Sequence, residues 1–157
     1  MADDIDTLRR ILASTRVIAV VGLSADWFRP SFFAAKYMQA HGYRIIPVNP
    51  KYPEILGERS YPSLLDIPEP VDMVDVFRRA EDVLPIAQQA VQIRAKVLWQ
   101  QLGVHNREAE AQARAAGLDT VADRCVKIEH ARLFGGLNWV GVNTRVISAR
   151  RPRWLAY

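Results

Sequence analysis

The stretch that decides the fold is Val17-Ile-Ala-Val-Val21, an unbroken apolar run that leads directly into Gly22. A strand covered by helices on both faces carries such a run, whereas a half-exposed strand alternates apolar and polar residues. A helix is predicted to follow at residues 32–40, with Ser31 as its N-cap and Gly42 just beyond its end. This succession of strand, loop and helix predicts the first unit of a parallel sheet.

The same alternation continues along the chain. Further apolar runs predict four more principal strands, at residues 44–48, 73–77, 96–100 and 118–122. Helical patterns are found before, between and after the strands, at residues 5–12, 81–94, 107–116 (with Asn106 as N-cap) and from 127 onward. We therefore expect an α/β protein: a three-layer fold with right-handed crossovers and a mostly parallel sheet of five or six strands.

Two features of the second strand and its following segment modify this pattern. Pro47 cannot donate a ladder hydrogen bond, so it is expected at a strand end or at a gap in the pairing. The proline-rich residues 49–70 predict a connection with only a short extended piece near Tyr61 and a helical turn at 63–66.

Composition limits the classes of protein that the chain can represent. Its 157 residues are 50% hydrophobic and 24% charged, which predicts one domain, with a core at about 15–134 and a C-terminal extension at 135–157. The formal charge of +4 suits an anionic ligand but is too small to indicate nucleic acid. An acidic N-terminus, no membrane-spanning apolar run and a single cysteine predict a soluble, cytoplasmic protein without an internal disulfide.

The loop after the first strand has the parts of a phosphate site. In open parallel sheets, ligands bind beyond the carboxyl ends of the strands. This loop holds Gly22, the basic Arg29 and a helix start at Ser31, and free amides at a helix start bind phosphate. Because a full G-x-G-x-x-G is absent, a plain turn in which Ser31 only caps the helix is the alternative.

The loop after the second strand favours one class of nucleotide. An NAD site usually has an acidic side chain there, which binds the ribose hydroxyls. Pro47-Val-Asn-Pro-Lys51 has no carboxylate and one cation, so a ligand with an additional phosphate on its adenosine ribose, such as CoA or NADP, is favoured over NAD. The alternative for Lys51 is a solvated loop charge.

The loops after the third and fourth strands add groups at the same edge of the sheet. Phe77, Arg78 and Arg79 are suited to stack on an adenine or clamp a pyrophosphate. Gln101 offers an amide for a ligand's polar groups, and Gly103 a backbone without a Cβ. A capped strand end is the alternative for this last loop.

Taken together, these motifs resemble a known family, the small stand-alone CoA-binding proteins, which are similar to the CoA-binding Rossmann domain of the succinyl-CoA synthetase alpha subunit. The resemblance runs from about residue 17 to 132, through Val20-Val-Gly-Leu-Ser24, Arg29-Pro-Ser31, Ile46-Pro-Val-Asn-Pro50, Val76-Phe-Arg78, Trp99-Gln-Gln-Leu-Gly103 and Asp123-Arg-Cys125. It implies a Rossmann-like domain with CoA bound by Gly22, Leu23, Ser24, Arg29, Pro30, Ser31, Asn49, Pro50, Lys51, Phe77, Arg78, Gln101, Leu102 and Gly103.

The function that the resemblance implies is binding of CoA or acyl-CoA without catalysis, as a sensor, a carrier or a partner of a CoA-dependent enzyme. Catalysis in the synthetase needs a phosphohistidine domain and an ATP-binding subunit, for which we expect no room here. We predict no catalytic or metal site, and we interpret His41, His105 and His130 as surface or capping residues.

Cys125 follows the last strand at the same edge of the sheet. A buried, inert thiol is the expected state of a single cysteine. The alternative is a reactive thiol whose pKa is lowered by Arg124 and which forms a mixed disulfide with the thiol of CoA.

Two other classes of function stay open at this point. An NADP-dependent reductase would hold the 2′-phosphate at Lys51 but has no second domain to form a substrate pocket. An interaction domain could have kept the fold and lost the ligand. We interpret the C-terminal arginines and tryptophans as a solvated end, and the apolar residues 137–147 as packing on the core or forming a homodimer contact, so nucleic-acid binding is not expected.

Overall fold

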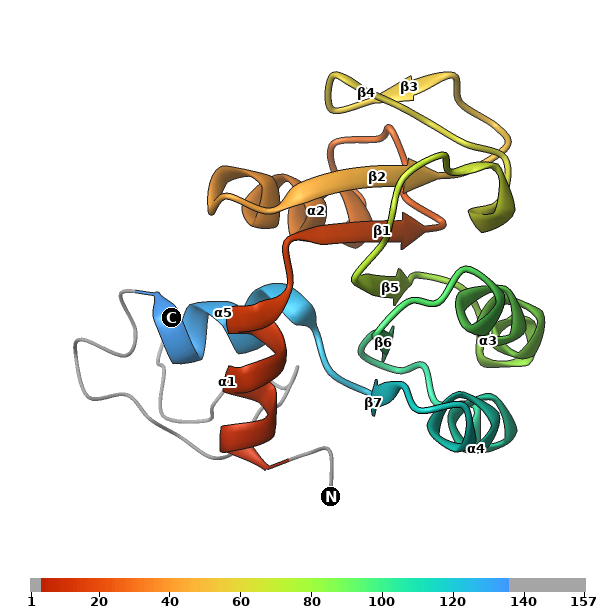
Figure 1. Cartoon of the computed structure of the whole chain (residues 1–157). Helices are drawn as coiled ribbons and strands as arrows, with labels where there is room; N and C mark the ends of the chain where they lie inside the picture. Colours follow the sequence, from red (N-terminus) through yellow and green to blue (C-terminus); the bar gives the residue numbers. More distant parts are fainter. Residues whose placement is uncertain (1–3, 136–157) are drawn as a thin grey trace.

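A computed structural model describes residues 4–135, which form a parallel five-stranded sheet between two layers of helices (Figure 1). The strands of this sheet are β1 (Val17–Val21), β2 (Arg44–Val48), β5 (Met73–Val76), β6 (Val97–Gln100) and β7 (Asp119–Val121). The helices are α1 (Ile5–Ser14), α2 (Pro30–Ala40), α3 (Val83–Gln92), α4 (Arg107–Ala115) and α5 (Val126–Phe134). The predicted three-layer α/β fold is confirmed.

The sheet separates two hydrophobic cores. Adjacent residues of a strand point to opposite faces, so each strand contributes to both cores. In β1, Ile18 and Val20 pack in the core under α1, α2 and α5, whereas Ala19 and Val21 pack in the core under α3 and α4. This double burial explains why the run at residues 17–21 contains no polar side chain.

The strand order is β2-β1-β5-β6-β7, and it reverses between β1 and β5. The chain runs from β1 outward to β2, and then returns past β1 to β5. The loops after β1 and β5 therefore diverge at this point, and a crevice between them is the expected ligand site of such a sheet. The five strands are parallel, and Figure 1 shows the arrows of β1 and β2 pointing to the right, so the carboxyl ends of the strands lie on that side.

β2 is the outermost strand on one side of the sheet, and the segment after β2 covers its outer side. The amide of Tyr61 donates to the carbonyl of Pro47 (3.0 Å), and the amide of Asn49 donates to the carbonyl of Tyr61 (2.9 Å). Because the N and C=O of one strand residue point to the same side, the missing N–H of Pro47 also lies on the outer side and costs no bond to β1. The expected gap in pairing at Pro47 is therefore wrong, since β2 pairs with β1 in unbroken register through Pro47 and Val20. The extended piece near Tyr61 and the helical turn, η1 (Leu64–Asp66), are confirmed.

Two details of this region differ from the sequence prediction. The hairpin of β3 (Glu54–Ile55) and β4 (Glu58–Arg59) was not predicted. Helix α2 begins at Pro30, so Arg29 and not Ser31 occupies the N-cap position. Proline suits the first helical position, since its fixed φ and missing N–H cost nothing there.

Elsewhere the predicted helix boundaries hold closely. Asn106 caps α4 as predicted, with its side chain accepting from the amide of Ala109 (2.9 Å). The helix predicted from residue 81 is preceded by a 3-10 turn, η2 (Ala80–Asp82), and α3 begins at Val83. Within residues 4–135, no helix is long and apolar enough to span a membrane. The expected homodimer contact at 137–147 and the basic C-terminus lie outside the described residues.

Candidate functional site

A cavity of about 940 Å³ opens at the carboxyl ends of the strands, at the reversal of strand order. Its size is within the range of small-molecule and cofactor sites. Most of the residues predicted from the sequence line it: Gly22, Ser24, Arg29, Pro30, Ser31, Asn49, Lys51, Phe77, Arg78, Gln101 and Leu102. The structure therefore brings together loops that follow four different strands.

Three predicted residues are not part of the lining. Leu23 is fully buried in the core under α1, α2 and α5. Pro50 is exposed between two lining residues. Gly103 has a positive φ of +82°, and its amide donates to the carboxylate of Asp123 (2.7 Å), so it shapes the turn after β6.

Other lining residues were missed as ligand contacts: Asp26, Tyr52, Asp82, Val104 and Ile128. Val104 and Ile128 are apolar, and an apolar residue in a loop or on a helix such as α5 gives no sequence signal of a ligand. Tyr52 and Asp82 lie just outside the stretches that sequence reasoning selected.

Gly22 forms the floor of the cavity between β1 and β5. Its φ is +85°, a conformation that side-chain-bearing residues rarely adopt. A Cβ at this position would also lie 3.3 Å from the side chain of Arg78. The amide of Gly22 donates to the carbonyl of Val48 (2.9 Å), which ties the turn to β2.

Asn49 and Ser31 hold the loops on either side of that floor. The Asn49 side chain donates to the carbonyl of Leu23 (3.0 Å) and accepts from the amide of Lys51 (3.0 Å), which joins the loops after β1 and β2. The Ser31 hydroxyl accepts from the amide of Ser24 (3.1 Å). Ser31 thus fixes the loop in front of α2 and does not cap the helix.

Cationic side chains concentrate on the β2, β1 and β5 part of the cavity: Arg29, Lys51, Arg78 and Arg79. Arg79 is paired with Asp82 (3.2 Å) and Glu81 (3.4 Å). Within the described part of the chain, Arg29, Lys51 and Arg78 form no salt bridge. Three cations without carboxylate partners can bind phosphate groups.

The β6 and β7 part of the cavity is largely apolar, with Leu102, Val104 and Ile128 beside Gln101 and Cys125. Burial raises the pKa of the Cys125 thiol. Arg124 does not lower it, since its guanidinium pairs with Glu129 (3.1 Å). The alternative of a thiol activated by Arg124 is therefore wrong. Cys125 is partly buried at the cavity wall and not the fully buried thiol that was expected.

Asp75 lies behind this part of the cavity and was missed in the sequence. It is a carboxylate in the middle of β5, 2% exposed, and its Oδ1 accepts from Nε2 of Gln101 at 2.5 Å. Burial raises the pKa of Asp75 to about 7. A single acid inside an apolar strand run is easily read as a strand residue, which is why sequence reasoning passed over it.

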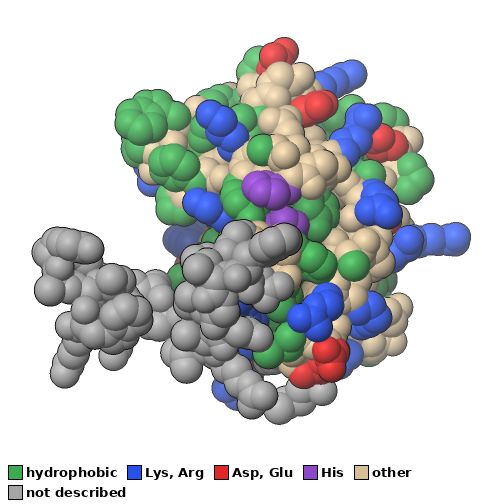
Figure 2. Space-filling model, turned by 90° about the vertical axis from the view of Figure 1, so that its left-hand side faces the viewer, with side chains coloured by type: hydrophobic (Ala, Val, Ile, Leu, Met, Phe, Trp, Pro, Cys, Tyr) green, Lys and Arg blue, Asp and Glu red, His purple; other side chains and the backbone are tan. Residues whose placement is uncertain are grey.

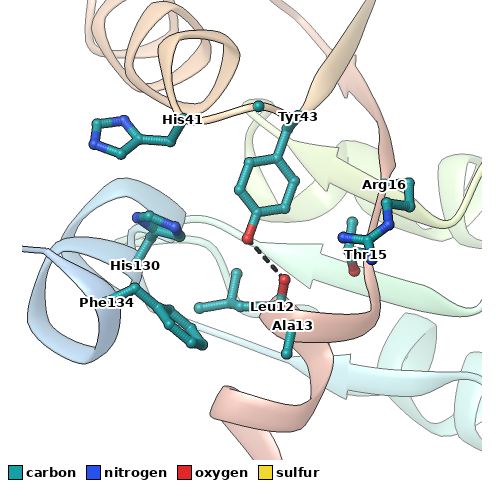
Figure 3. A pocket seen from close by; sticks show the side chains of 9 residues that line it. Leu12, Ala13, Thr15, Arg16, His41, Tyr43, His130 and Phe134 are labelled. Carbon is teal, nitrogen blue, oxygen red and sulfur yellow. Dashed lines mark hydrogen bonds between the residues drawn. The ribbon is translucent and has the colours of Figure 1, made fainter.

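A smaller cavity of about 190 Å³ lies at the amino ends of β1 and β2, opposite to the first cavity (Figure 3). Tyr43, which donates to the carbonyl of Leu12 (2.7 Å), lines it with His41, His130 and Phe134. Figure 2 shows this face, with histidine side chains next to each other near its middle; the rings of His41 and His130 are 5.1 Å apart.

The histidine interpretation needs correction at one position. His130 is 7% exposed and shares a hydrogen bond with the Tyr37 hydroxyl (3.1 Å), so it is not a surface residue. His105 is exposed, as expected, and its Nε2 lies 2.5 Å from a carboxylate oxygen of Glu110. Among residues 4–135, no group of three or more His, Cys, Asp or Glu side chains is placed to hold a metal ion.

Comparison with known proteins agrees with this geometry. Residues 16–131 match a family model described as a CoA binding domain. The uncharacterized protein YneT of Bacillus subtilis is 41% identical over 124 residues, which is 79% of this chain and 92% of that protein. An ADP-forming acetate–CoA ligase of Archaeoglobus fulgidus is 34% identical over 85 residues, which is 53% of this chain but 13% of the ligase.

Solved structures give the same result. A hypothetical protein from Pyrococcus horikoshii has a TM-score of 0.82 and 43% identity, covering 84% of this chain and 93% of that one. A Thermus thermophilus protein has a TM-score of 0.80 and 38% identity, covering 83% of this chain and 99% of that one. The matched region includes every strand of the sheet and all the predicted site residues. The chain belongs to the CoA-binding domain family, as its sequence motifs predicted.

Proposed function

We propose that the protein binds CoA or acyl-CoA in the cavity at the carboxyl ends of the strands and catalyses no reaction of its own. The observation that carries this proposal is the group of unpaired cations, Arg29, Lys51 and Arg78, around the floor at Gly22. CoA carries a diphosphate and a 3′-phosphate on its adenosine ribose, so its nucleotide end needs several cations at one site.

Each group has a distinct role in this proposal. Lys51 binds the 3′-phosphate, and its backbone is held by Asn49. Arg29 and the first amides of α2, which has no acidic residue in its first turn, bind the diphosphate. Phe77, Arg78 and Gln101 flank the ligand.

The absence of catalysis is proposed from the side chains around the cavity. The described lining contains no histidine. Its one thiol, Cys125, has a pKa raised by partial burial, so little thiolate is available at neutral pH. A sensor, a carrier or a partner of a CoA-dependent enzyme requires binding alone.

Calorimetric titration with CoA, 3′-dephospho-CoA and NADPH tests the proposal. We expect a micromolar dissociation constant for CoA, equivalent to about 8 kcal/mol, and weaker binding without the 3′-phosphate. Lys51→Ala should weaken CoA and leave 3′-dephospho-CoA unchanged. Lys36→Ala, an exposed lysine on α2 outside the cavity, is the matched control.

The other outcomes separate the remaining classes of function. Tight binding of NADPH in place of CoA would support a reductase. Binding of none of the three ligands would overturn the proposal and favour an interaction domain that has lost its ligand.

A further inference from the structure

The inference concerns Asp75 and rests on the proposed function. The cavity changes character across the sheet: cations follow β1, β2 and β5, whereas apolar residues follow β6 and β7. CoA changes in the same way, from its phosphates to an uncharged pantetheine that ends in a thiol or thioester. When the phosphates of CoA bind at the cations, the sulfur end of the ligand points toward the apolar part of the cavity, where Gln101 lies.

Gln101 presents one end of its side-chain amide to a buried acid. Its side chain lines the cavity although the residue is 3% exposed, and its Nε2 donates to Oδ1 of Asp75. Within residues 4–135, no hydrogen bond is made by Gln101 Oε1, and this oxygen is not among the fully buried atoms that lack a partner. The carbonyl end of the amide is therefore accessible from the cavity.

We propose that Asp75 is a positioning residue that sets whether Gln101 presents a hydrogen-bond acceptor or a donor to the sulfur end of the ligand. An ionised Asp75 can only accept, so it holds Nε2 and leaves Oε1 for the ligand. A protonated Asp75 has an O–H whose burial without a partner is costly. This O–H donates to Oε1 and turns Nε2 toward the cavity.

The two states of Gln101 suit two forms of the ligand. An acceptor pairs with the S–H of free CoA, whereas a donor pairs with the carbonyl oxygen of a thioester. Ionised Asp75 therefore favours CoA, and protonated Asp75 favours acyl-CoA. Both states are populated near neutral pH, because burial raises the pKa of Asp75 to about 7.

The residues that surround Asp75 in the sheet and on α2 are uncharged, so the proposed pH dependence is assigned to the Asp75 carboxyl. Val20 of β1 and Trp99 of β6 flank it in the sheet, and from the loop after β7 the thiol of Cys125 interacts with it. On the same face of the sheet, α2 contributes Ala34 and Ala35 to the core.

Helix α5 brings one further acid to that face. Glu129 is fully buried and forms ion pairs with Arg124 (3.1 Å) and Arg132 (2.6 Å), so its charge is compensated. Asp75 forms no ion pair with any residue in 4–135, and its hydrogen-bond partner is Gln101.

The test compares dissociation constants for CoA and acetyl-CoA at pH 6 and pH 8. Both ligands carry the same phosphates, so phosphate titration cancels in the ratio of Kd for CoA to Kd for acetyl-CoA. We expect this ratio to be about tenfold higher at pH 6, the size of one hydrogen bond gained or lost. Asp75→Asn should make the ratio independent of pH, and Asp66→Asn, an exposed acid on η1, should leave its pH dependence intact.

The outcomes distinguish failure of the inference about Asp75 from failure of the proposed CoA binding. A wild-type ratio that does not change with pH, while CoA still binds, would overturn the inference and leave the proposed function standing. Failure of both ligands to bind would overturn both. If Asp75→Asn does not fold, Gln101→Met removes the amide with little change of shape: a flat ratio supports the inference, and a ratio that still changes with pH rejects it.

Discussion

A Cβ atom placed on Gly22 would lie 2.3 Å from the carbonyl oxygen of Phe77. Real Cβ atoms essentially never lie this close to another atom, so the backbones of the turns after β1 and β5 approach each other here too closely for a side chain at Gly22. This contact lies at the reversal of strand order, directly under the cavity. The cavity floor is therefore set by main-chain atoms, which cannot move aside as a flexible side chain can.

Gly22→Ala should destabilise the fold. The substitution adds the cost of a positive φ to a clash with backbone, together about 2–5 kcal/mol. Gly57→Ala is the matched control, since Gly57 also has a positive φ (+74°) but nothing within 4 Å of its Cβ position. Urea unfolding of the two variants measures the difference, and equal losses would show that the contact with Phe77 is unimportant.

Asp72 is expected to stabilise the start of β1 in a pH-dependent manner. Its carboxylate accepts from the amides of Arg16 and Val17, each at 3.0 Å. Burial raises its pKa, but these amides and Lys96 outweigh burial and hold the pKa below 3.8. A carboxyl whose pKa is lowered by folding stabilises the fold at pH values above its ordinary pKa. This stabilisation is lost as the pH falls through the pKa of the folded state.

Asp72→Ala should therefore cost about 1–3 kcal/mol at pH 7 and progressively less in acid. Urea unfolding at a series of pH values between 7 and 3 measures both quantities. A loss that is the same at every pH would show that side-chain packing, and not the carboxylate, is responsible.

His130 should make the fold less stable in mild acid. Burial and then the charge of His41 lower its pKa below 6.5. The folded protein therefore takes up this proton less readily than the unfolded chain, and stability falls as pH drops below 6.5. NMR titration should give a pKa of His130 below 6.5. The substitution His130→Phe should reduce the loss of stability between pH 7 and pH 5.

His105→Asn serves as the control for this prediction, because His105 lies on an exposed loop outside the cluster in Figure 3. It should retain the acid sensitivity of the wild type. If His105→Asn, and not His130→Phe, removes that sensitivity, His130 is not its source.

Cys125 should react slowly in the folded protein. Its pKa is raised by burial, and only the thiolate is a nucleophile. At pH 7 we expect iodoacetamide to modify it much more slowly than in the urea-unfolded chain, and CoA disulfide to give no adduct by intact mass. Rapid adduct formation in the folded state would show an activated thiol.

The sequence was sufficient for features that depend on local pattern. The apolar run at residues 17–21 identified a strand buried on both faces, and Asn106 identified the start of α4, because each signal lies within a few residues. The predicted loops also meet in one cavity, since parallel strands bring their carboxyl ends to the same edge.

Features that depend on contacts between distant segments were not predictable in the same way. Ser31 has the composition of a cap but bonds to Ser24, because Pro30 already begins the helix. Asp75 and His130 are buried polar residues whose hydrogen-bond partners, Gln101 and Tyr37, come from other segments of the chain. No local pattern encodes such partners.

The backbone pairing of Tyr61 with the outer side of β2 also bears on how the protein behaves at high concentration. An open strand edge is a template for another chain, and long exposed edges promote aggregation. At β2, the segment at Tyr61 occupies part of the edge, and Pro47 lacks the N–H that an incoming strand would need. At the other edge, β7 is only three residues long and Asp119 is paired with Arg10 (2.9 Å). Both edges of the sheet are thus poor templates for strand addition, which opposes aggregation through edge-to-edge pairing of the sheet.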